Sequence, residues 1–307
     1  IEITDEVDMQ DFLGFSVQIL QNGKIKLSKP QLTRSILDEI NFKLNTKGAE
    51  TPAPTNVTVH EEKYGEYFSG PWHYRKVIGK LNHLVKSTRP DISYSVSQFS
   101  FFQARSKQSH AQEVKRLCRY LICTKDKGII LNPTSVGLEF WVDADFSGKW
   151  DFLLRDVASE DATTANSRSV WIIMYANCPI LWTLKLQTLV TLSTTKTEYF
   201  SLSQALREFM PMISLVKELK TMVFELPSGV SSVHCSVFEN NNGALEMAKF
   251  PKILPRTKHI NVKYHHFRSA IEDGVIKLFK VETSKQLADI LTKAFSRKHL
   301  IALCCKI

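Results

Sequence analysis

The chain has 307 residues, of which 43% are hydrophobic and 23% are charged, with 12 glycines and 11 prolines. This length predicts two domains of ordinary size, and the composition excludes a collagen-like, low-complexity or disordered chain. No stretch approaches the roughly 18 consecutive apolar residues of a membrane-spanning helix, so we expect no membrane partner. The 40 lysines and arginines exceed the 31 aspartates and glutamates, and the net charge of +9 favours a polyanionic partner.

The six cysteines include no C-x-x-C pair, and no signal peptide is recognisable. This pattern predicts reduced thiols in an intracellular protein, either cytoplasmic or nuclear. The chain begins with Ile1 rather than methionine, inside an acidic stretch. We therefore expect it to be part of a longer protein.

The first half of the chain predicts a β-hairpin followed by helices. Alternating apolar residues flank Asn22 and Gly23, a dipeptide that favours a tight hairpin turn. Ser28, followed by Pro30 and Gln31, predicts a helix that starts with a capping box. The patterns that follow predict a polar loop over 44–70, helices over 73–102 (interrupted at Arg89-Pro90) and 110–123, and a domain boundary within 128–137.

The second half alternates strands and helices. The predicted strands cover 138–146, 170–175, 180–192, 233–238 and 275–281, and the predicted helices cover 199–216, 243–248, 262–271 and 284–295. Pro211 should kink the first of these helices. Three meandering strands followed by alternating helices and strands predict a mixed sheet with helices packed over it.

Asp143 and Asp145 end the first strand of this half, and the two-residue period of a strand places both on one face. Carboxylates at the end of a strand could hold a divalent cation. Considered alone, the pair is better interpreted as solvated turn residues.

Glu198 and Asp289 also have structural interpretations that are favoured when each residue is considered alone. Thr195 and Glu198 have the spacing of a capping box at the start of the long helix. Asp289 and Lys293 have the i,i+4 spacing of an ion pair on a solvated helix face.

The motifs taken together are more informative than any one of them. They are Phe-Leu-Gly-Phe at 12–15 with the hairpin, Tyr-Arg-Lys-Val-Ile-Gly at 74–79, Ser-Thr-Arg-Pro-Asp-Ile at 87–92, Val-Asp-Ala-Asp at 142–145, Leu-Ser-Thr-Thr at 192–195, Arg-Thr-Lys-His-Ile at 256–260 and Leu-Ala-Asp-Ile-Leu-Thr-Lys at 287–293. In this order, over nearly the whole chain, they resemble the C-terminal part of the Pol polyprotein of copia-type LTR retrotransposons.

The resemblance implies two regions. Residues 1–130 would be the C-terminal thumb and connection region of a reverse transcriptase, a smaller α+β region. Residues 136–297 would be an α/β ribonuclease H-like domain, a mixed five-stranded sheet with helices. The polymerase of this family has a Tyr-x-Asp-Asp turn, and this chain contains no Asp-Asp dipeptide. DNA synthesis by this chain is therefore not expected, and the missing polymerase and integrase parts of the polyprotein would be its partners.

In this family four carboxylates hold two Mg²⁺ ions, which support hydrolysis of the RNA strand of RNA–DNA hybrids. Matched motif by motif, the four positions are Asp143, Glu198, Asn240 and Asp289. The three acidic residues would be metal ligands, whereas Asn240 lacks the negative charge of a carboxylate. Such a site should hold its second ion poorly and could bind only one. Glu239 is an unsuitable replacement, because neighbouring side chains of a strand point to opposite faces.

This substitution leaves several hypotheses open. The first is a retrotransposon-derived ribonuclease H that is impaired by Asn240. The alternative is a non-catalytic nucleic-acid-binding remnant of a degenerate Pol polyprotein. A third is a segment that functions only when it is joined to the missing polymerase.

The strongest local cluster of positive charge covers 251–268, which contains no acidic residue. Its candidate nucleic-acid contacts are Lys252, Arg256, Lys258, His259, Lys263 and Arg268. Such a stretch suits phosphate contacts along a duplex, and the absence of acids favours this interpretation over the alternative, a solvated basic face. No cysteine pair accompanies the histidines, so the pattern does not favour zinc. An RNA–DNA hybrid would be recognised by backbone shape and 2′-hydroxyl groups.

Overall fold

The computed structural model describes residues 11–42, 46–55, 59, 64–134, 137–146, 166–222, 235–249 and 267–307. The chain divides into two compact units. The first unit comprises Ile1–Asn132 together with Lys293–Ile307, and the second comprises Pro133–Thr292. Among the described helices, none combines the length and apolar character needed to span a membrane.

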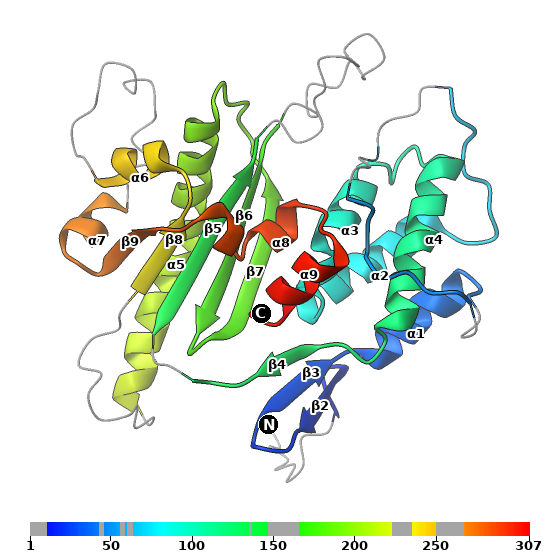
Figure 1. Cartoon of the computed structure of the whole chain (residues 1–307), viewed down its shortest axis with the longest axis horizontal. Helices are drawn as coiled ribbons and strands as arrows, with labels where there is room; N and C mark the ends of the chain where they lie inside the picture. Colours follow the sequence, from blue (N-terminus) through cyan, green and yellow to red (C-terminus); the bar gives the residue numbers. More distant parts are fainter. Residues whose placement is uncertain are drawn as a thin grey trace, which may run out of the picture. The chain divides into compact units, whose positions relative to one another are not determined.

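The first unit contains an antiparallel four-stranded sheet (Figure 1). In order across the sheet, its strands are β1 (Asp11–Phe12), β2 (Phe15–Ile19), β3 (Ile25–Ser28) and β4 (Ile129–Leu131). Asn22 and Gly23 have φ values of 80° and 73°, which confirms the predicted hairpin turn between β2 and β3. β4 pairs with β3, so the end of this region returns to the sheet where it began.

Helices form the rest of the first unit. They are α1 (Pro30–Glu39), α2 (Tyr74–Ser87), the 3₁₀ turn η1 (Pro90–Ile92), α3 (Ser93–Ser100), α4 (Gln108–Cys123) and α9 (Arg297–Cys304). The predicted interruption at Arg89-Pro90 is confirmed. Fully buried side chains of α2, including Val77 and Leu81, and of α4, including Val114 and Leu117, belong to the core.

The predicted capping box at the start of α1 is wrong. The N-cap is Lys29, and no side chain caps the helix. Pro30 occupies the first turn, where its fixed φ suits the start of a helix without a capping side chain. The Thr33 hydroxyl instead donates back to the Lys29 carbonyl at 3.1 Å.

The second unit is built on a mixed five-stranded sheet (Figure 1). Its strands are β5 (Leu138–Asp145), β6 (Arg168–Tyr175), β7 (Cys178–Leu186), β8 (Cys235–Glu239) and β9 (Ile276–Lys280), in the spatial order β7-β6-β5-β8-β9. The β5-β6-β7 meander is antiparallel, whereas β8 runs parallel to both β5 and β9. The predicted meander and the predicted mixed sheet are both confirmed.

Helices cover this sheet. They are α5 (Thr194–Met222), α6 (Asn242–Lys249), α7 (Arg268–Glu272), the 3₁₀ turn η6 (Thr283–Lys285) and α8 (Asp289–Thr292). α5 packs on β5 and β6, where the rings of Phe140 and Phe209 stack with centroids 4.5 Å apart. Every residue of β6 from Arg168 to Met174 is buried, so both faces of the sheet are covered at its middle.

The single predicted helix over 284–295 is wrong. The backbone at Gln286 is extended (φ −68°, ψ 112°), which separates η6 from α8. The buried Gln286 side chain donates to the Val142 carbonyl at 2.7 Å, and this long-range bond opposes continuous helix. Of the predicted helix over 262–271, residues 262–266 lie outside the described residues, and α7 begins at Arg268.

Candidate active site

Asp143, near the end of β5, is the point where two helical segments meet the sheet. Its side chain is buried, and the Thr292 hydroxyl of α8 donates to its Oδ2 at 3.1 Å. The Ser201 hydroxyl of α5 donates to the backbone carbonyl of the same residue at 2.7 Å. Asp143 is therefore buried and hydrogen-bonded, not a solvated turn residue.

Glu198 lies one helical turn before Ser201 on α5. Residues three apart share a helix face, so the Ser201 bond brings the Glu198 face toward the end of β5. Glu198 is only 8% exposed. At the start of α5, the Ser193 hydroxyl accepts a hydrogen bond from the Lys196 backbone N–H at 3.4 Å. Thr195 and Glu198 both lie inside the helix. The capping-box interpretation of Glu198 is therefore wrong.

Asp289 begins α8 and lies one turn before Thr292, the residue that binds Asp143. The Gln286 bond to Val142 fixes the same segment to β5 from its other end. Asp289 is 4% exposed, so its face of α8 is buried and not solvated. Two tethers to β5 thus position the Asp289 segment beside Asp143.

Asn240 follows β8, which runs parallel to β5 with Trp141 beside Phe238. When this pairing is continued by two residues along both strands, Asn240 lies beside Asp143. The Asn240 Oδ1 atom is buried and accepts no hydrogen bond from the described residues. An amide oxygen of this kind has the donor chemistry of a ligand for a hard cation.

Glu239 is a buried acidic group of this site that the sequence pattern excluded as a replacement ligand. It lies on the face of β8 that also buries Cys235 and Val237, as strand alternation predicts. Its Oε1 accepts the Asn241 backbone N–H at 2.9 Å. Burial raises the pKa of Glu239 well above its ordinary value, and the nearby Asp143 charge raises this pKa further. A charged residue at the end of a buried strand was the signal in the sequence.

Asp145 forms an ion pair with a buried arginine, Arg168. The buried Arg168 side chain donates to its Oδ2 at 2.8 Å. This ion pair joins the ends of β5 and β6. It gives Asp145 a structural role beside the candidate site.

The four predicted positions thus come from β5, α5, the end of β8 and α8. Their oxygen donors suit Mg²⁺, and the unsatisfied Asn240 Oδ1 is consistent with a ligand position. Within the described part of the chain, however, no three Asp, Glu, His or Cys side chains are close enough together to hold a metal ion. The Mg²⁺ ligands therefore stay a prediction.

Most of the predicted basic nucleic-acid surface lies outside the described residues, including Lys252, Arg256, Lys258, His259 and Lys263. Arg268 is described and half-buried at the start of α7. It donates to the Met247 carbonyl at 2.7 Å, so it ties α7 to α6.

The strand order, the strand directions and the covering helices define a ribonuclease H-like fold for the second unit. A solved structure of the N-terminal RNase H domain of a Mycobacterium tuberculosis protein, fused to maltose-binding protein, matches 56% of this chain and 98% of its own chain. Its sequence identity is 12% and its TM-score is 0.33.

The chain is a homologue of copia-type retrotransposon Pol polyproteins. It is 31% identical over 298 residues to the retrovirus-related Pol polyprotein from transposon RE2 of Arabidopsis thaliana, covering 96% of this chain and 19% of that protein. It is 28% identical over 312 residues to the corresponding polyprotein from transposon TNT 1-94 of Nicotiana tabacum, covering 96% and 22%. The chain thus spans about a fifth of the length of these relatives. No family model matches it.

Proposed function

We propose that the second unit is a retrotransposon-derived ribonuclease H that hydrolyses the RNA strand of RNA–DNA hybrids, and that Asn240 impairs it. The observation that supports this most strongly is the pair of hydrogen bonds at Asp143. Through Ser201 and Thr292 they join the two helices that contain Glu198 and Asp289 to the strand that contains Asp143. These bonds hold three distant segments together at one end of a ribonuclease H-like sheet, and the pairing of β8 with β5 adds the fourth.

Asp143, Glu198 and Asp289 would hold Mg²⁺, and Asn240 would contribute one neutral oxygen. When bound, Mg²⁺ supplies activation of water and stabilisation of the charge that develops on the phosphate. The protein's own contribution is positioning: Thr292 fixes the Asp143 carboxylate, and Ser201 fixes the backbone that bears it. A loss of about 3 kcal/mol of transition-state stabilisation at Asn240 would reduce the rate more than a hundredfold.

The second candidate is a nucleic-acid-binding remnant without turnover. Two observations favour it. Asn240 lacks a charge where the family has a carboxylate, and no three of the described Asp, Glu, His or Cys side chains form a group that could hold a metal ion. Under this alternative, hybrid binding persists in low salt and no cleavage occurs in Mg²⁺ or Mn²⁺.

Cleavage of a labelled RNA–DNA hybrid by the full chain separates the two candidates. The parent is compared with Asn240→Asp, which restores the charge, and with Asp143→Asn. Asn242→Asp is the matched control, because it adds the same charge at an exposed neighbouring position. We expect Asn240→Asp to increase cleavage by at least tenfold, Asn242→Asp to leave it unchanged, and Asp143→Asn to abolish it.

Two results would decide against the proposal. A parent with ordinary ribonuclease H activity that gains nothing from Asn240→Asp would show that the site is assigned wrongly. If neither the parent nor Asn240→Asp cuts while both bind the hybrid, the remnant is the correct function.

A further inference from the structure

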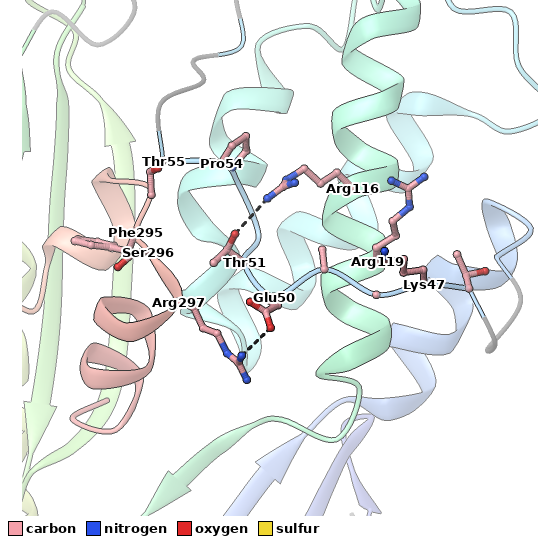
Figure 2. A pocket seen from close by; sticks show the side chains of 13 residues that line it. Lys47, Glu50, Thr51, Pro54, Thr55, Arg116, Arg119, Phe295, Ser296 and Arg297 are labelled. Atoms are coloured by element: carbon pink, nitrogen blue, oxygen red, sulfur yellow. Dashed lines mark hydrogen bonds and ion pairs between the residues drawn. The ribbon is translucent and has the colours of Figure 1, made fainter.

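The first unit contains a pocket of about 800 Å³ that is separate from the candidate active site. Three segments line it, all within this unit: residues 46–55, α4, and the start of α9 (Figure 2). This volume is within the usual range for a small-molecule site, roughly 300–1,000 Å³.

The pocket is built by contacts that hold the 46–55 segment against α4. A Cβ at Gly48 would come within 1.8 Å of the Cys123 Sγ, so only glycine permits this close approach to the end of α4. Arg116 Nη2 donates to the Thr51 hydroxyl at 3.2 Å. Arg297 Nη1 binds Glu50 Oε1 at 2.7 Å, and because both side chains are exposed this pair contributes little to holding α9 and the segment together. Figure 2 shows both connections across the pocket.

The charge of the lining is strongly one-sided. Its four cationic side chains are Lys47, Arg116, Arg119 and Arg297. Glu50 is the acidic residue of the lining, and it is already paired with Arg297. Within the described part of the chain, the other three cations form no ion pair.

Arg116 is the clearest sign of a ligand. It is partly buried, and its Nε is shielded from solvent without a hydrogen-bond partner among the described residues. Arg119 lies three residues further on, on the same face of α4. Both residues line the pocket, and a guanidinium group presents forked donors that match the oxygens of phosphate better than lysine does. The bond to Thr51 accounts for only one of the donors of Arg116.

We propose that this pocket binds a phosphate group, with Arg116 and Arg119 as its main donors. The phosphate would belong to a nucleic-acid strand or to a free nucleotide. The proposal concerns the first unit alone, so it is independent of whether the second unit cleaves hybrids.

The test is fluorescence anisotropy of a labelled eight-nucleotide single strand with the full chain, competed with unlabelled ATP or pyrophosphate. Arg116→Gln with Arg119→Gln removes two charges from the pocket. Lys115→Gln with Lys125→Gln is the charge-matched control, because neither lysine lines the pocket. We expect at least tenfold weaker binding for the pocket variant than for the control. We also expect a salt slope flatter by roughly 0.7 for each phosphate that the variant no longer neutralises.

Competition identifies the source of the phosphate. Displacement by pyrophosphate or ATP indicates a site for an isolated phosphate group, whereas displacement only by an unlabelled strand indicates the nucleic-acid backbone. Equal affinity and equal slope in the pocket and control variants would overturn the proposal.

A second variant keeps the proposal testable if loss of Arg116 prevents folding. Glu50→Gln changes an exposed side chain and removes the negative charge of the described lining. It should strengthen strand binding severalfold. Unchanged or weaker binding by this variant would contradict a phosphate site here.

Discussion

The Arg89 guanidinium binds the Asp91 carboxylate through two parallel hydrogen bonds, Nε to Oδ1 and Nη2 to Oδ2, each 2.8 Å long. Both side chains are buried. The Tyr120 hydroxyl donates to the same carboxylate at 2.7 Å, and Arg89 also donates to the carbonyl and hydroxyl of Thr124. The Arg-Pro-Asp motif of the sequence is thus a buried network that joins η1 to the end of α4.

Asp91→Asn should destabilise the protein strongly, because it leaves the Arg89 charge buried without its counter-charge. Removal of one partner of a buried ion pair costs about 3–5 kcal/mol. Urea unfolding followed by circular dichroism measures this destabilisation. The matched control is Glu282→Gln, which breaks an exposed pair with Lys285 and should not change the free energy of unfolding measurably. Equal effects of the two substitutions would contradict the role given to the buried network.

The same network predicts acid sensitivity. Burial alone would raise the pKa of Asp91, but Arg89 and the Tyr120 hydroxyl outweigh this effect and hold the pKa below its ordinary value of 3.8. A lowered pKa means that the unfolded chain binds the proton more readily. The stability contributed by Asp91 is therefore complete above about pH 4 and is lost as the pH falls further. Unfolding measured from pH 5 to pH 2 should show this decrease in the parent and a smaller one in Asp91→Asn.

For the second unit, Glu239 should give the stability the opposite dependence on pH. Burial and the Asp143 charge raise its pKa, so the folded protein retains a proton that the unfolded chain has released. Stability should fall as the pH rises above the ordinary glutamate value of about 4.5. Glu239→Gln should flatten this fall and raise the free energy of unfolding at pH 8. Urea unfolding at pH 5 and pH 8, with a chelator present, tests it; an unchanged pH slope in the variant would assign the effect elsewhere.

Thr292→Val should destabilise the second unit and disturb its site together. Valine keeps the shape of threonine but removes the hydroxyl that donates to Asp143. Loss of one partner of a buried polar group costs about 1–3 kcal/mol. Thr283→Val, at an exposed position of η6, is the control and should leave the thermal unfolding temperature unchanged. If the proposed ribonuclease activity exists, Thr292→Val should also reduce it, and normal stability of this variant would contradict the tether.

Features that depend on local chemistry could be predicted from the sequence. The Asn22-Gly23 turn and the break before Pro90 follow from the backbone preferences of these residues. The break at Gln286 could not be predicted, because it is compensated by a hydrogen bond to Val142, 144 residues away in sequence. Helical periodicity also does not identify a packing partner, so it could not place α9 in the first unit.

In the candidate site, too, some features follow from the sequence pattern and others depend on tertiary contacts. The order of the motifs predicted Asp143, Glu198, Asn240 and Asp289 as the site. The local sequence around each of the three acidic residues instead favoured a solvated or helix-capping role. Those interpretations failed because burial of Asp143, Glu198 and Asp289 depends on tertiary packing. Strand alternation predicts the correct face for Glu239. It could not show that the Asp143 charge lies close enough to raise the pKa of Glu239.

The basic stretch 251–268 gives a prediction that depends on charge alone. If it contacts phosphates along a hybrid, Arg256→Gln with Lys258→Gln should weaken binding and reduce the slope of log K against log salt. For a duplex the slope changes by roughly 0.9 for each phosphate that the protein no longer neutralises. Lys277→Gln with Lys280→Gln removes the same charge from exposed positions of β9 and serves as the control. A slope that changes equally in both double variants would indicate net charge as the cause and would remove this stretch from the interface.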